Sequence, residues 1–208
     1  MQILGLSDEI IGFVHSPAVR EKYGQVDLIA SCGDLPANYL EYVVSMLDKP
    51  LIYVPGNHDR DDYAVQGGVN LDGALTHIAG LWIAGFGGSR RYKSDGRHQY
   101  TELQMASRLL RRLPRLLLRR LVTGHGVDIL LTHAPPRHIH DAEDWAHRGF
   151  VAFRGFISLI RPRLMLHGHA HIHRNLDVTE SSFRGCRVIN VFPNKLIELN
   201  SSGVRREA

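Results

Sequence analysis

Five short polar motifs in this 208-residue chain contain residue types that bind metal ions. Each motif directly follows a short apolar run, and the set is Ser7-Asp8, Gly33-Asp34, Gly56-Asn57-His58-Asp59, Thr132-His133 and Gly168-His169-Ala170-His171. As ligands they offer two carboxylates, one amide oxygen and three imidazoles, which suit Mn, Fe, Co, Ni or Zn better than Ca or Mg. Ligands at the carboxyl ends of neighbouring strands meet in one crevice although they are distant in sequence. The motifs therefore predict one metal centre.

The elements that would position these motifs follow from short apolar runs that alternate with longer periodic stretches, a pattern typical of strands joined by helices. Ser16-Pro17 and Asn38 resemble helix starts, because a short side-chain oxygen caps free N–H groups and proline fits the first turn. We expect helices over 16–23, 38–47, 102–121 and 149–160, with Pro114 as a candidate break in the third. We expect strands over 2–7, 27–31, 51–54, 82–86, 128–132, 164–166, 187–192 and 195–199. The last two, on either side of Pro193-Asn194, predict an antiparallel hairpin and therefore a mixed sheet system.

Composition limits the class of protein. With 44% hydrophobic and 22% charged residues, the chain can build a large core, and we expect a single domain over 1–208. Cys32 and Cys186 are too few for a disulfide scaffold, and we expect Cys32 to be a buried apolar residue. No apolar run approaches the roughly 20 residues of a membrane span, and no leader-like pattern precedes the first strand. These features predict a cytoplasmic protein without a membrane partner.

The ordered set of motifs resembles the calcineurin-like metallophosphoesterase superfamily, whose pattern runs D-x-H, G-D, G-N-H-[DE], a later His and G-H-x-H. The resemblance spans residues 8–171, and the short chain with its Ser-Cys-Gly-Asp-Leu-Pro stretch at 31–36 resembles a small prokaryotic branch of undefined substrate. It implies an α/β fold, a four-layer αββα sandwich of two mixed β-sheets flanked by helices.

The same resemblance implies a site with two divalent metal ions, with Mn²⁺ favoured over Fe, Zn, Co or Ni. Asp34 would bridge the two ions. Asn57, His133 and His169 would complete one site, and Asp8 and His171 would serve the other. A metal-activated water would then attack a phosphomonoester or a phosphodiester.

The residues after Asn57 have the expected catalytic roles. His58 would face the leaving group, where an imidazolium can donate a proton or offset the phosphate charge. Asp59 would either orient the His58 ring or cap the turn that follows it.

Ile10 occupies the position of the histidine in the first family motif. Isoleucine has no donor atom, so one metal site loses a ligand and its affinity should fall. Three alternatives follow: water or substrate fills the position, Glu9 or His15 moves in, or the position stays empty. We favour the first, and we therefore predict two metal sites of unequal affinity.

Nine of the 13 histidines fall within 125–173, and several lie in the segment 133–150, which we expect to be a loop beside the metals. Loops on a rigid scaffold commonly carry specificity. The candidate substrate contacts are Arg137, His138, His140 and His147. In the alternative interpretation Asp141, Asp144 and His147 only hold the loop together by hydrogen bonds.

Two further segments have less specific patterns. Residues 102–121 combine six arginines with leucines at helical spacing, which predicts an amphipathic helix with a solvated basic face. The alternative is a surface that attracts anions, for which nucleic acid is a conceivable but unsupported partner. The glycine-rich stretch 85–92 lacks the spacing of a phosphate-binding loop and is expected to be a turn.

The sequence therefore predicts a metal-dependent phosphoesterase that acts on a phosphate ester. The competing prediction is a non-catalytic interaction scaffold, a use that the family allows in its retromer subunit. Ile10 favours the scaffold, whereas His58 and the intact ligand set of the other metal site favour the enzyme. The sequence predicts neither the substrate nor the oligomeric state.

Overall fold

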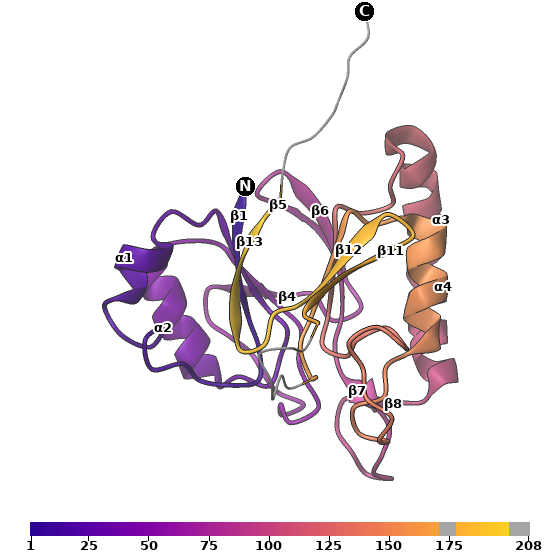
Figure 1. Ribbon diagram of the computed structural model, residues 1–208, viewed down its shortest axis with the longest axis horizontal. Helices are drawn as coiled ribbons and strands as arrows, with labels where there is room; N and C mark the ends of the chain where they lie inside the picture. The colour runs from indigo at the N-terminus through magenta and orange to yellow at the C-terminus, as the bar shows by residue number, and fades with distance from the viewer. Residues whose placement is uncertain (171–177, 200–208) are drawn as a thin grey trace, which may run out of the picture.

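The computed structural model describes residues 1–170 and 178–199, and its elements form four layers (Figure 1). Helices α1 (Val19–Tyr23) and α2 (Ala37–Leu47) cover one sheet, and α3 (Glu102–Thr123) and α4 (Val151–Ile160) cover the other. The predicted αββα sandwich of two mixed sheets is confirmed. None of the helices in the described part of the chain combines the length and apolarity that crossing a membrane requires.

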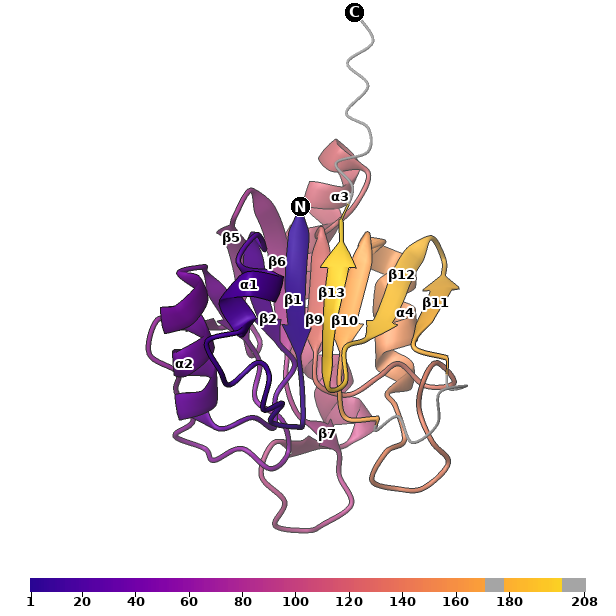
Figure 2. The same ribbon diagram turned by 60° about the vertical axis from the view of Figure 1, so that its left-hand side comes forward.

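The first sheet has the strand order β13-β1-β2-β3-β4. Strands β1 to β4 pair in parallel, whereas β13 pairs antiparallel to β1 (Figure 2). The strands are β1 (Gln2–Leu6), β2 (Leu28–Ser31), β3 (Leu51–Tyr53), β4 (Gly68–Asn70) and β13 (Asn194–Glu198).

The second sheet has the order β11-β12-β10-β9-β6-β5. Its four inner strands are parallel, and both edge strands pair antiparallel to their neighbours. The strands are β5 (Leu75–Ile78), β6 (Leu81–Phe86), β9 (Ile129–Thr132), β10 (Leu164–His167), β11 (Glu180–Phe183) and β12 (Cys186–Asn190). A small parallel pair, β7 (Ser89–Arg90) and β8 (Gln99–Tyr100), lies outside both sheets.

The strands are apolar on both faces, because each sheet packs against helices on one side and against the other sheet on the other. Along β9, Ile129 and Leu131 belong to the core between the sheets, and Leu130 packs toward α3 and α4. Along β1, Ile3 lies between the sheets, and Leu4 packs toward α1 and α2. Continuous apolar runs are the expected pattern for strands that are buried on both faces. Cys32 is fully buried, as predicted.

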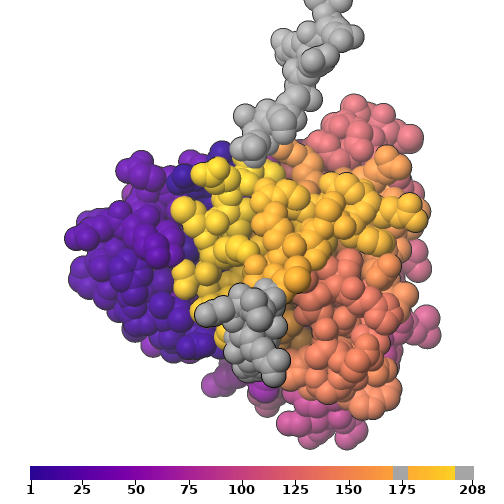
Figure 3. Space-filling model, in the orientation of Figure 1, coloured from indigo at the N-terminus to yellow at the C-terminus, as the bar shows by residue number. Residues whose placement is uncertain are grey.

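The predicted hairpin of 187–192 with 195–199 is wrong. Strand β12 pairs with β10 and β11 in the second sheet, whereas β13 pairs with β1 in the first. The chain between them crosses from one sheet to the other, and the hairpin forms instead between β11 and β12 around Arg184-Gly185, where both residues have positive φ. In Figure 3 these late strands, in yellow, fill the surface between the indigo N-terminal layer and the orange segment.

Helix boundaries differ from the predictions in two places. Helix α1 begins at Val19 and α2 at Ala37, so neither Ser16 nor Asn38 is a cap. The Ser16 hydroxyl instead donates back to the Phe13 carbonyl oxygen, at 2.7 Å.

Helix α3 is continuous through Pro114. Its packing also differs from the prediction, because its leucines lie on two faces. Leu109 and Leu116 are buried in the core, whereas Leu110, Leu118 and Leu121 are 59%, 66% and 84% exposed. The solvated face of α3 is therefore apolar as well as basic.

Candidate metal centre

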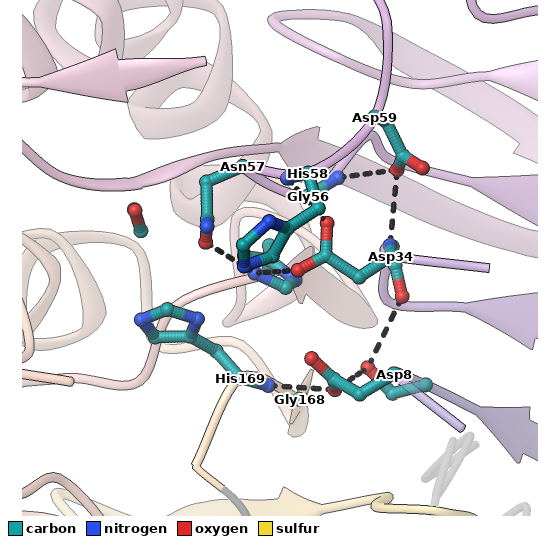
Figure 4. A network of polar contacts seen from close by, with 12 residues as sticks. Asp8, Asp34, Gly56, Asn57, His58, Asp59, Gly168 and His169 are labelled. Carbon is teal, nitrogen blue, oxygen red and sulfur yellow. Dashed lines mark hydrogen bonds and ion pairs between the residues drawn. The ribbon is translucent and has the colours of Figure 1, made fainter. Parts of the chain in front are cut away.

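The five motifs meet at the carboxyl ends of the central strands of both sheets. Asp8, Asp34 and Asn57 follow β1, β2 and β3, and His133 and His169 follow β9 and β10. Asp8, Asp34, His133 and His169 each offer a donor atom, and these four atoms all lie within 4.8 Å of one another (Figure 4). The Asn57 Oδ1 atom lies 3.1 Å from His133 Nε2 and so belongs to the same cluster. His171, the remaining predicted ligand, lies outside the described residues.

Backbone carbonyl groups fix the orientation of both histidines. His133 Nδ1 lies 2.7 Å from the Cys32 carbonyl oxygen, so Nδ1 carries the donated proton and Nε2 faces the cluster. His169 Nε2 lies 2.6 Å from the Ala146 carbonyl oxygen, which leaves Nδ1 for a cation. Metal-binding histidines typically donate their second N–H in this way, because the bond sets the tautomer and the ring orientation.

The Asp34 carboxylate is held by its neighbours. Its Oδ1 accepts the His58 backbone N–H at 2.8 Å, and its Oδ2 lies 3.4 Å from His133 Nε2. Burial alone would raise the pKa of Asp34, but the charge and hydrogen bond of His133 and the His58 backbone N–H together outweigh it and lower that pKa.

The two buried histidines have opposite pKa shifts. Burial would lower the pKa of His133, but the Asp34 carboxylate outweighs it and raises that pKa to about 9. Burial and the His133 charge lower the pKa of His169 to about 3. The carboxylates of Asp8 and Asp34 thus favour positive charge at this point, and a bound cation would supply it. His169 stays neutral, which is the form of histidine that binds metals. The donor set therefore fits a divalent metal ion.

Asp59 joins the loops that carry the ligands. Its Oδ2 atom accepts the Gly56 N–H at 2.7 Å and the Asp34 N–H at 3.0 Å, as the dashed lines in Figure 4 show. None of the hydrogen bonds found in the described residues links Asp59 to the His58 ring or to the turn that follows. Asp59 thus positions the backbone of Asp34, which neither interpretation of the sequence anticipated.

Two motif glycines are required by close packing. A Cβ atom at Gly168 would overlap Ser7 Oγ and lie 2.6 Å from Asp8 Oδ2. One at Gly56 would overlap Asp34 Oδ1 and lie 2.8 Å from the Asp34 nitrogen. Asp8 and Asp34 are candidate ligands, and Ser7 directly precedes Asp8. The two glycines therefore allow the loops that carry the candidate ligands to approach each other.

Three of the candidate ligands have a left-handed backbone. Asp8, Asp34 and His169 have φ values of 64°, 58° and 64°. Such conformations cost a residue other than glycine about 1 kcal/mol or more, and they persist where the surrounding structure imposes them. Their presence at three ligands is consistent with a functional site.

Asp8, Asp34, Asn57 and His169 of the cluster line a pocket of about 360 Å³. His58 is exposed and lies on its wall, beside residues that the ligand motifs do not include. The lining residues are Asp8, Asp34, Asn57, His58, Tyr92, Ala146, His147 and His169. Tyr92 was not predicted as a site residue, although it lies at the end of the glycine-rich stretch 85–92, the one signal that could have indicated it.

Of the four predicted substrate contacts, only His147 lines this pocket. Arg137 forms ion pairs with Asp141 and Glu143, and the His138 N–H donates to Asp141. These contacts hold the loop together, in line with the alternative interpretation.

His140 points away from the pocket toward the second sheet. Its ring nitrogens lie 2.9 Å from His167 Nε2 and 2.8 Å from Ser181 Oγ. The structure therefore separates His140 from His147, although the two residues are close in sequence.

His15 does not supply the nitrogen ligand that is missing at Ile10. Ile10 is 48% exposed. The His15 ring packs against the rings of Tyr39 and Tyr42, with centroids 5.4 and 4.6 Å away. Glu9 is exposed.

Comparisons with known proteins agree with this geometry. The family model described as calcineurin-like phosphoesterase matches residues 5–173. The uncharacterized protein MJ1162 of Methanocaldococcus jannaschii is 25% identical over 191 residues, which cover 84% of this chain and 81% of the relative. The crystal structure of TT1561 of Thermus thermophilus superposes with a TM-score of 0.64 at 18% identity, covering 92% of this chain and 89% of that one. At this identity, the similarity to that structure shows a shared fold only.

Proposed function

The chain belongs to the calcineurin-like phosphoesterase family, and we propose that it hydrolyses a phosphomonoester or a phosphodiester with the aid of two divalent metal ions. The observation that carries this proposal is the set of four donor atoms within 4.8 Å of one another, three of which belong to residues that line an open pocket. Divalent ions held there would polarise the phosphate ester and lower the pKa of a water nucleophile.

The roles of individual residues follow from their positions. We propose that Asp34 bridges the two ions, because its carboxylate lies 3.4 Å from His133 Nε2 and has a donor atom within 4.8 Å of one of Asp8. Asn57, His133 and His169 would hold one ion, and Asp8 would serve the other together with His171. His58 is positioned to donate a proton to the leaving group, since its backbone N–H is bound to Asp34 and its ring is exposed in the pocket.

We further propose Mn²⁺ as the metal, on the basis of the mixed oxygen and nitrogen ligands. Ile10 supports unequal affinities for the two ions, because the second site lacks one protein nitrogen. Metal analysis after gentle dialysis should return about one tightly held equivalent per chain; two tightly held equivalents would contradict the unequal sites.

The test of the activity is turnover of a chromogenic phosphomonoester and a chromogenic phosphodiester with added Mn²⁺. We expect metal-dependent turnover of at least one ester, reduced by about 10²-fold or more in His58→Ala. His77→Ala, an exposed histidine on β5, is the matched control and should leave turnover unchanged.

The competing proposal is a non-catalytic scaffold, which Ile10 favours. Absence of metal-dependent turnover for both esters, with a folded protein, would support the scaffold. We also propose a cytoplasmic location, which the two unpaired, buried cysteines Cys32 and Cys186 support.

A further inference from the structure

Tyr92 is a pocket residue outside the ligand motifs whose side chain contacts a candidate ligand directly. Its hydroxyl oxygen accepts a hydrogen bond from Asn57 Nδ2 at 3.2 Å, and its side chain lines the pocket beside His58. The residue reaches this position from the segment that links β7 and β8, far from Asn57 in sequence.

In the structure the nitrogen end of the Asn57 amide faces Tyr92 and the oxygen end faces the metal cluster. An amide has an acceptor oxygen and a donor NH₂, and only the oxygen can bind a cation. Because Nδ2 donates to Tyr92, Oδ1 turns to the cluster, where it lies 3.1 Å from His133 Nε2. A flipped amide would present a donor to the cation, and the Tyr92 hydroxyl would then have to donate its own proton to Oδ1. When the hydroxyl gives its proton to a group in the pocket it can only accept from Asn57, which keeps Nδ2 on Tyr92 and Oδ1 on the cluster.

The same hydroxyl has a proton to donate. Its oxygen accepts from Asn57, and within residues 1–170 and 178–199 no acceptor for the Tyr92 proton is found. The open space next to Tyr92 is the pocket over the metal cluster, where the oxygen atoms of a phosphate ester would lie.

The backbone holds Tyr92 in place independently of its hydroxyl. Gln99 is buried, and its Oε1 atom accepts the N–H groups of Tyr92 and Lys93 at 3.1 and 3.0 Å. The Lys93 ammonium lies 5.5 Å from the centre of the Tyr92 ring. Removing only the hydroxyl should therefore leave the ring in position.

We propose that Tyr92 has two functions in the site: it positions the amide oxygen of Asn57 toward the metal, and it donates a hydrogen bond from its hydroxyl to a phosphoryl oxygen of the bound ester. The second function rests on the proposed phosphoesterase activity and extends it by a specific substrate contact.

The test compares wild type, Tyr92→Phe and Tyr42→Phe, using Mn²⁺ and inorganic phosphate as probes. Tyr42 lies on α2 and packs against His15, so its hydroxyl is the matched control. Calorimetry measures the affinity for Mn²⁺, and then for phosphate at saturating Mn²⁺. We expect Tyr92→Phe to weaken Mn²⁺ binding by about tenfold and phosphate binding by about tenfold. Tyr42→Phe should bind both as wild type does.

Each outcome decides the proposal. Unchanged affinities in Tyr92→Phe would overturn it, as would an equal loss in Tyr42→Phe. A loss of phosphate affinity alone would support the substrate contact and overturn the positioning of Asn57. These binding measurements need no turnover. If the wild-type protein hydrolyses neither ester, the proposed activity is refuted, and the binding data still test the two functions of Tyr92.

Discussion

His169 Nε2 lies 2.6 Å from the carbonyl oxygen of Ala146, so a candidate metal ligand is oriented by the loop that forms one wall of the pocket. The rings of His169 and His147 also pack together, with centroids 5.1 Å apart. A change in this loop should therefore alter metal binding as well as substrate binding.

Asp144 tests this coupling. Its Oδ1 atom accepts the backbone N–H groups of Ala146 and His147, each at 3.1 Å, and so fixes the turn that carries the Ala146 carbonyl. We expect Asp144→Ala to weaken Mn²⁺ binding by about tenfold, measured by calorimetry. Asp95→Ala, an exposed carboxylate outside this loop, is the control. Equal affinity in the wild type and Asp144→Ala would show that the loop does not hold His169.

Asp34→Asn should remove most of the metal affinity. The substitution keeps the size of the side chain but removes the charge that attracts a cation and that pairs with His133. A ligand that binds only the folded state raises the melting temperature. We expect Mn²⁺ to raise the melting temperature of the wild type and of Asp62→Asn, an exposed carboxylate, but not of Asp34→Asn. A shift in Asp34→Asn as large as that of the wild type would argue against a bridging role.

Gly168→Ala should displace Asp8. The added Cβ atom would overlap Ser7 Oγ, and the Ser7 hydroxyl donates to the Asp8 carboxylate. We expect a loss of about 1–3 kcal/mol in the free energy of unfolding, from overpacking of a tight site, together with reduced metal content. Gly155→Ala is the control, because its Cβ atom would meet nothing within 4 Å in helix α4, and it should stabilise the protein by up to about 1 kcal/mol. Normal metal content in Gly168→Ala would contradict the close packing.

His140 should make the protein less stable in acid. Burial lowers its pKa to about 4, and the Lys195 charge adds to the shift, whereas Glu180 opposes it. His167 and Ser181 occupy both ring nitrogens. The unfolded chain, with an ordinary histidine pKa near 6.5, binds a proton that the folded chain does not. The free energy of unfolding should therefore fall as the pH falls from about 6.5 to about 4.

Replacing this histidine separates its contribution from those of the other buried histidines. In His140→Asn, which tolerates the positive φ at this position, urea unfolding should show a shallower fall in stability over the same pH range. Parallel pH profiles for the wild type and His140→Asn would mean that His140 is not the group responsible.

Much of the fold and of the metal cluster could be predicted, because each ligand follows an apolar strand and the strands are parallel. Tyr92 could not be, since its place depends on how β7, β8 and Gln99 arrange the segment after β6. The prediction of a hairpin over 187–199 was wrong for a different reason. Strands buried on both faces have no polar face, so the sequence of 187–199 does not indicate to which sheet each strand belongs.

Helix α3 shows the same limit. Leucines recur on both sides of the helix, and the spacing alone does not distinguish the side that packs on the sheet from the side that stays in solvent. Arg108 also turns inward, where it pairs with Asp72 and stacks on the Tyr100 ring. Arg108 was predicted to lie on the solvated face of α3, but it is part of the packing of this helix.

The left-handed backbone at Asp8, Asp34 and His169 has a consequence for how the protein can evolve. Glycine at any of these positions would relieve the backbone, but it would also remove the donor atom that the side chain supplies. The chain therefore keeps an unfavourable backbone conformation at three positions in exchange for the contacts that these side chains make. A library screened for metal binding should retain these three side chains, although glycine would suit the backbone better.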